Sequence, residues 1–120
     1  MWYFYLMNAA VCIYLARHDA QALKEDRPQD INHPINGAVH IGMSLLLWIA
    51  GGFWHGVAGL FESVIVFDIS MNLMRHLSPF YLPIKPKSIK DKIEKIVFFN
   101  SGLAAKITYL IGFIICIYYA

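Results

Sequence analysis

Long uncharged runs dominate the hydrophobic pattern of this chain. Residues 41–61 contain no Asp, Glu, Lys or Arg, and a helix of that length, rising about 1.5 Å per residue, matches a hydrocarbon core roughly 30 Å thick. Residues 1–16 are also uncharged, and residues 97–120 contain only Lys106. The pattern predicts an all-α, polytopic integral membrane protein with three transmembrane helices, at about 2–17, 38–61 and 98–119.

The middle hydrophobic segment is too long for one crossing. No proline interrupts residues 38–77, and one helix over all of them would extend about 60 Å, twice the hydrocarbon thickness. Either a single helix crosses and its last turns emerge, or the chain folds back near residues 51–52 or 55–56 and crosses four times in all. We favour the single helix, because the fold-back places Glu62 and Asp68 inside a span, where an acidic side chain costs about 2.5–3.5 kcal/mol near the centre.

The connections between these spans, residues 18–37 and 75–97, differ in pattern. In the second connection, Pro79, Pro83 and Pro86 exclude a regular helix between residues 78 and 88. Apolar residues then recur at helical spacing among charged ones, which predicts a short amphipathic helix at the lipid surface. Its apolar positions are Ile89, Ile93, Ile96 and Val97.

Composition supports a membrane protein. Hydrophobic residues make up 58% of the chain, against about 45–50% in soluble domains, and 120 residues suit a single transmembrane domain. A net charge of +2 is too small to suggest nucleic-acid binding. Cys12 and Cys116 lie in apolar runs without a CxxC spacing, so we expect buried thiols and no metal site.

Histidine placement also argues against a cofactor. Neither the first nor the last span contains a histidine, so two axial ligands for a haem are not available within one chain. The histidines of the first connection match no zinc-ligand spacing. We therefore expect neither a metal nor another cofactor.

Basic residues indicate an orientation. Residues 17–37 hold three of the ten Lys and Arg residues, and residues 75–106 hold the other seven. The positive-inside rule then predicts that the 75–97 connection is cytoplasmic. With three crossings, the N-terminus is cytoplasmic too, and the host is an inner or cytoplasmic membrane.

Polar and small side chains share one side of the expected middle helix. At about 100° per residue, His40, Ser44, His55 and Glu62 fall near one line. Ionisable side chains within a membrane are candidates for a proton or ion route. The same region carries glycines at helix-packing spacing, including a GxxxG pair, and we favour packing over titration. These glycines are Gly51, Gly52, Gly56 and Gly59.

Two functions follow from these features. The first is a membrane protein that assembles through its middle helix, as a homo-oligomer or as a subunit of a larger complex, with a pore or proton route as a special case. The alternative is an interfacial enzyme acting on lipid headgroups at the cytoplasmic exit of that helix, where acidic, amide and basic side chains come together. Its catalytic residues would be Asp68, Asn72, Arg75, Asp91 and Lys92.

Overall fold

The computed structural model describes residues 1–83 and 88–120. These residues form α helices and no strand, so the predicted all-α fold class is confirmed for them. The elements in chain order are α1 (Trp2–Lys24), a 3-10 turn η1 (Pro28–Asp30), α2 (His33–Gly51), α3 (Phe53–Met74), α4 (Ile89–Val97) and α5 (Gly102–Tyr119).

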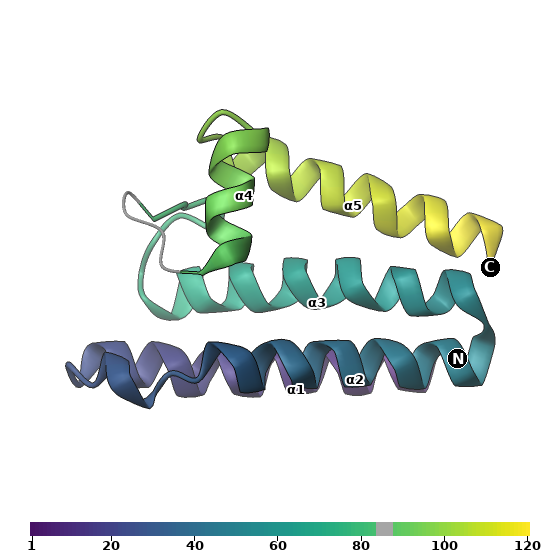
Figure 1. The fold of residues 1–120 in the computed structure, drawn as a ribbon, viewed down its shortest axis with the longest axis horizontal. Coiled ribbons are helices and arrows are strands. Elements are labelled where there is room, and N and C mark those ends of the chain that lie inside the picture. The colour runs from purple at the N-terminus through teal and green to yellow at the C-terminus, as the bar shows by residue number, and fades with distance from the viewer. Residues whose placement is uncertain (84–87) are drawn as a thin grey trace.

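Four long helices lie alongside one another and alternate in direction (Figure 1). Helix α3 is central and contacts α1, α2 and α5. Both chain termini and the turn between α2 and α3 lie at one end of the bundle, which we call the turn end. The two longer connections lie at the opposite end, which we call the connection end. The molecule measures 40 Å along its longest axis, close to the roughly 40–45 Å of a bilayer with its headgroups.

A sharp turn at Gly52 separates α2 from α3. Gly52 adopts a φ of +97°, a left-handed conformation that glycine reaches without steric penalty. The favoured prediction of one uninterrupted helix is therefore wrong, and the alternative of a fold-back near residues 51–52 is what the structure contains. Helix α3 packs closely on α2. The contacts between the two helices stabilise the turn relative to one long uninterrupted helix.

Three helical segments are long and apolar enough to cross a membrane: Pro28–Gly51, Phe53–Met74 and Gly102–Tyr119. The count agrees with the expected three, but two of them replace the single span at 38–61. A crossing by residues 2–17 stays a prediction. The added turn also changes the orientation argument, because the N-terminus and the 75–97 connection lie at opposite ends of the bundle rather than on one side (Figure 1).

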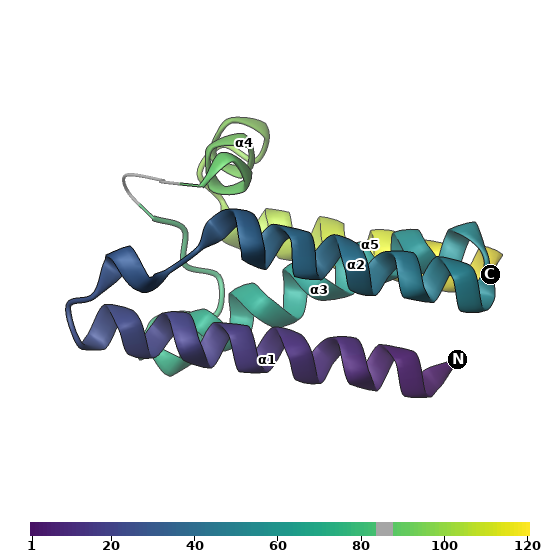
Figure 2. The same ribbon diagram turned by 60° about the horizontal axis from the view of Figure 1, so that its bottom comes forward.

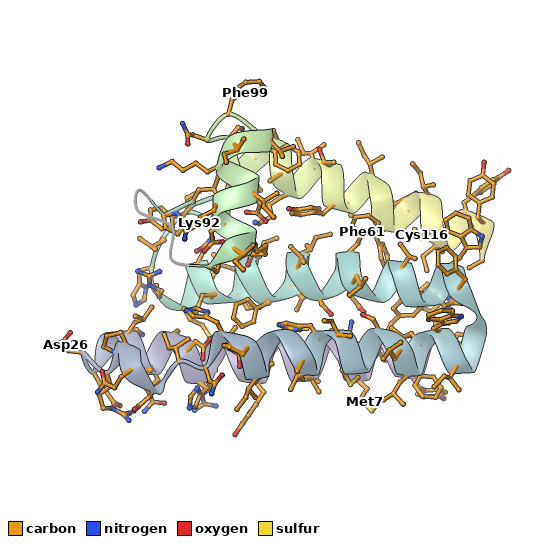
Figure 3. The ribbon with its side chains drawn as sticks, in the orientation of Figure 1. Met7, Asp26, Phe61, Lys92, Phe99 and Cys116 are labelled. Carbon is orange, nitrogen blue, oxygen red and sulfur yellow. The ribbon has the colours of Figure 1, made fainter. Side chains whose placement is uncertain are left out.

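The bundle has a polar interior and an apolar exterior. Its small hydrophobic core includes Tyr5, Leu47, Ala58 and Cys116, and Phe61 and Cys116 lie between α3 and α5 (Figure 3). Both cysteines are buried and free, as expected. Large apolar side chains such as Leu6, Ile49 and Ile115 are exposed instead. A lipid environment accommodates such a surface, whereas water does not.

The predicted amphipathic helix is present with the predicted bounds, as α4. The Ser88 hydroxyl caps it by accepting a hydrogen bond from the Asp91 backbone N–H over 3.1 Å. Helix α4 crosses the direction of the long helices in Figure 1 and is seen nearly end-on in Figure 2. Residues 78–83 form no helix, as their prolines predict, and Pro86 lies outside the described residues.

Candidate functional site: a polar track inside the bundle

The polar residues of α1 are turned toward the other helices. Tyr5, Asn8, Cys12 and Asp19 are buried, and their spacing of three, four and seven residues places them on one side of a helix. The opposite side presents apolar residues, among them Met7, which points away from the bundle (Figure 3). Helix α1 therefore supplies much of the polar interior.

Asn8 is the centre of the internal hydrogen-bond network. Its amide nitrogen donates to Glu62 Oε2 over 2.7 Å and to the Gly59 carbonyl over 3.2 Å. Its amide oxygen accepts from the Ser63 hydroxyl over 3.1 Å and from the Cys12 thiol at 3.9 Å. Asn8 is fully buried, and these contacts satisfy the side chain, which an apolar interior otherwise disfavours.

Nearer the turn end, His55 on α3 pairs with Tyr5 on α1. The Tyr5 hydroxyl and His55 Nδ1 are 2.8 Å apart, and the edge of the Tyr5 ring contacts Phe113 of α5. Either partner can donate in this pair, depending on which ring nitrogen of His55 carries the proton. The pair joins a titratable imidazole to a phenol in a part-buried position.

His40 and Ser44 lie on α2, so the four residues predicted to share one line are divided between two helices. His40 Nδ1 is 3.5 Å from the Cys12 thiol, and its ring packs edge-on against Phe67. The Ser44 hydroxyl donates to the His40 carbonyl of its own helix over 3.0 Å. The prediction that these four residues share one side of a single helix is therefore wrong. His40, His55 and Glu62 nevertheless all point into the interior of the bundle.

We call this set of interior polar residues the polar track. It runs along α3 between α1 and α2, from the pair at His55 near the turn end to the pair at His40 farther along. All of its members are buried or half-buried. They are Tyr5, Asn8, Cys12, His40, His55, Glu62 and Ser63.

Gly56 and Gly59, two of the candidate packing glycines, face α2 of the same chain. A Cβ added at Gly56 would lie 2.7 Å from the Trp48 Cβ, and one at Gly59 would lie 2.5 Å from a Leu47 methyl group. At Gly51 an added Cβ would meet the His55 ring. Close approach of small residues thus joins α2 to α3, and Gly52 supplies the turn.

A second group of polar residues, the charged cluster, joins α3, α4 and α5 near the connection end. Asp68 Oδ2 accepts from Lys90 and also from Lys106, the latter over 2.7 Å. Lys90 pairs in addition with Asp91 at 3.2 Å and Glu94 at 3.1 Å. Each of the three helices therefore contributes at least one charge to the contact.

Glu94 and Lys90 have unusual environments in this cluster. Glu94 is 1% exposed; its Oε1 accepts from the Tyr109 hydroxyl over 2.8 Å, while its Oε2 has no partner among the described residues. Burial acts to lower the pKa of the Lys90 ammonium, but the carboxylates of Asp68, Asp91 and Glu94 outweigh it and raise that pKa. Lys90 is held in its charged form.

The residues predicted for a headgroup enzyme are only partly brought together. Asp68 and Asp91 both contact Lys90. Asn72 instead donates to the backbone carbonyls of Pro79 and Tyr81, each over 3.2 Å, so its amide nitrogen holds the connector. No hydrogen bond or ion pair within the described ranges links Arg75 or Lys92 to this carboxylate pair, and the Asp68 carboxylate is already occupied by two ammonium groups.

Several residues of both groups were not predicted from the sequence. Asn8 is the one amide in the uncharged first run, and Lys106 is the one charge in residues 97–120. A strongly polar side chain isolated in an apolar run needs a buried partner, and that signal could have identified both. Tyr5 and Tyr109 gave no such signal, because tyrosine is common near membrane interfaces.

The described part of the chain contains no group of three or more His, Cys, Asp or Glu side chains arranged to hold a metal ion. Comparisons with family models, with curated proteins and with solved structures found no match for this chain.

Proposed function

We propose that this chain is a small multi-span membrane protein that carries protons along the polar track. The observation that carries the proposal is the Glu62 carboxylate inside the bundle, bonded to Asn8 and flanked along α3 by the titratable His55. Ionisable side chains inside a membrane are by default candidates for a functional site such as a proton relay.

The surroundings of Glu62 suit a group that gains and loses a proton. The Asn8 amide nitrogen donates to it, which supports the charged form. None of the described ion pairs includes Glu62, so no fixed cation holds it permanently ionised, in contrast to Asp68. A carboxyl group that has a hydrogen-bond donor but no paired cation can exchange protons with water that enters the track.

Protons would have to cross gaps between the titratable groups. His55 and Glu62 are about 10.5 Å apart along α3, and Glu62 and Asp68 are about 9 Å apart, at 1.5 Å per residue. These gaps exceed direct hydrogen-bond reach, so transfer needs intervening waters or side-chain rotation. The Ser63 hydroxyl, one residue beyond Glu62 on α3, can both donate and accept, and in this structure it donates to Asn8.

We further propose that all four long helices cross the membrane. Helix α1 is less hydrophobic on average than the three candidate spans, because it carries Asn8 and, in its last turns, Arg17, His18, Asp19 and Lys24. Tyr5 and Asn8 face α3, while Leu6 and Ile13 are exposed. Both connections then lie on one side. By the positive-inside rule this side is cytoplasmic, and both termini lie on the other.

Proton flux in reconstituted vesicles tests the proposal. The purified chain is placed in vesicles containing a pH-sensitive dye, and a potassium diffusion potential drives proton entry. The wild type should acidify the interior faster than protein-free vesicles, and Glu62→Gln should remove the difference. Glu25→Gln is the matched control, because Glu25 is exposed and lies outside the track.

Equal acidification by the wild type, Glu62→Gln and protein-free vesicles would overturn the proposal. The polar track would then serve helix association alone.

A further inference from the structure

Helix α4 has its apolar side turned outward. Ile89 and Ile96 are about three-quarters exposed, at 75% and 76%, and Ile93 and Val97 are exposed as well. Phe99, just beyond the helix, is 89% exposed and projects away from the bundle (Figure 3). A helix packed on a protein core in water would place these residues inward.

The side of α4 that contacts the bundle is polar. Lys90 and Glu94, one turn apart, reach Asp68 of α3 and Tyr109 of α5. Glu94 is the most buried residue of the helix. Charge pairing therefore attaches α4 to the bundle, and the apolar side of α4 stays exposed.

A third side of α4 is charged and lies between the apolar side and the side that contacts the bundle. At about 100° per residue, Lys95 lies about 100° from both Glu94 and Ile96 around the helix axis, and Lys92 lies about 40° from Ile96, at the edge of the apolar side. Lys92 is exposed. The helix thus has three sides, one apolar, one paired with the bundle and one basic, and a membrane interface offers matching surroundings for each.

The charge distribution along the bundle identifies the surface that α4 meets. No Lys or Arg occurs in residues 1–16, 28–74 or 107–120, which form the turn end and most of the long helices. The basic residues in the described ranges gather instead toward the connection end, where α4 lies. Anionic headgroups attract such a surface. Helix α4 lies across the long helices (Figures 1 and 2), which is the direction parallel to the plane of a membrane that those helices would cross.

We infer that α4 is embedded in the leaflet at the connection end, with Ile89, Ile93 and Ile96 against phospholipid acyl chains and Lys92 at the headgroups. The occupant of the apolar side is lipid rather than a second protein, because α4 contacts α5, one of the candidate spans, and Leu103 and Ile107 in the first turns of α5 are exposed as well. The inference depends on immersion of the bundle and is independent of proton movement.

Collision measurements on spin-labelled full-length protein test this inference. Single labels are attached at Ile93→Cys and Ile96→Cys, with Lys92→Cys as the matched control on the same helix. The native Cys12 and Cys116 are buried, and unsubstituted protein gives the background. The protein is reconstituted in phosphatidylcholine–phosphatidylglycerol vesicles and exposed to oxygen, which enters lipid, or to a nickel chelate, which stays in water.

The inference predicts an oxygen-to-nickel collision ratio several-fold higher at positions 93 and 96 than at position 92. Equal nickel access at all three positions would overturn it by placing the apolar side in water. Low access to both reagents at positions 93 and 96 would also overturn it, because protein would then cover that side. All three sites are exposed, so the substitutions leave the buried contacts intact, and a failure of proton flux would not change these ratios.

Discussion

The side chains of Asn8 and Glu62 meet inside the bundle, with Asn8 Nδ2 donating to Glu62 Oε2 over 2.7 Å across 54 positions of sequence. Each residue alone would be costly in lipid, and together they satisfy part of each other's hydrogen-bonding capacity. The contact also fixes α1 against α3. It therefore links the stability of the fold to the proposed function of the track.

Asn8→Ala should destabilise the protein. The change removes an amide with several partners and leaves the buried Ser63 hydroxyl without its acceptor. We expect the free energy of unfolding to fall by about 1–2 kcal/mol, measured by denaturant titration in mixed micelles. Thr108→Ala is the control, since the exposed Thr108 hydroxyl bonds only within its own helix. Equal stability of both variants would contradict the central role of Asn8.

Gly56→Ala should loosen the hairpin of α2 and α3. The new Cβ would lie 2.7 Å from the Trp48 Cβ, and overpacking of this kind costs about 1–3 kcal/mol. Gly42→Ala is the matched control, because nothing lies within 4 Å of its Cβ position and alanine favours a helix by about 1 kcal/mol. Unfolding titrations should therefore move the two variants in opposite directions. A gain in stability for Gly56→Ala would show that the helices are not in close contact there.

Asp68→Asn should lower the free energy of unfolding more than a comparable substitution at an exposed ion pair does. It leaves Lys106, which is 4% exposed, without its anionic partner, and an unpaired buried charge costs about 3–5 kcal/mol. Asp30→Asn, at an exposed pair with Arg27, should cost under about 1 kcal/mol. Adding Lys106→Met to Asp68→Asn should recover part of the lost stability. No recovery in the double variant would mean that the loss arises elsewhere in the charged cluster.

The Lys90 amine should react slowly with amine-directed reagents. Its pKa is raised above the ordinary value of 10.5, so at pH 9 a smaller fraction is neutral and nucleophilic than for an ordinary lysine. Lys92, exposed on the same helix, is the internal reference. Mass spectrometry after brief acetylation should show modification of Lys92 before Lys90, and Asp68→Asn should narrow the difference. Similar rates at both amines would contradict the paired state of Lys90.

Much of the helical pattern was predictable because its causes are local. The spacing of Ile89, Ile93 and Ile96 defines α4 without reference to other segments. The prolines between residues 78 and 83 stop α3 from continuing. Uncharged length alone identified α5 and the middle segment as candidates for a membrane environment.

The turn at Gly52 was not decided by local sequence. Glycine permits both a helix and a left-handed turn, and the choice depends on whether α2 and α3 gain from packing on each other. That gain comes from Gly56 and Gly59 meeting Ser44, Leu47 and Trp48, which only the folded hairpin brings together. The cost assigned to Glu62 and Asp68 within a span took no account of their partners, which lie on other helices.

The members of the polar track on α3 were predictable from the sequence. The residues with which they pair were not. His55 and Glu62 were recognisable as ionisable residues in an apolar segment. Their partners Tyr5 and Asn8 lie about fifty residues earlier in the chain, and no periodicity within one helix specifies that register. The charged cluster likewise required α4 and α5 to be placed against Asp68.

Sidedness of labelling is the most direct test of the central claim, an antiparallel bundle that crosses the membrane with its turn and its connections on opposite faces. Single cysteines are introduced at Ala50, beside the turn, and at Gln29, in the first connection; both residues are exposed. In sealed vesicles of known orientation, an impermeant maleimide should label Ala50→Cys and Gln29→Cys from opposite sides. Protection of position 50 from both sides, as in one uninterrupted helix, or labelling of both positions from the same side, would contradict the account.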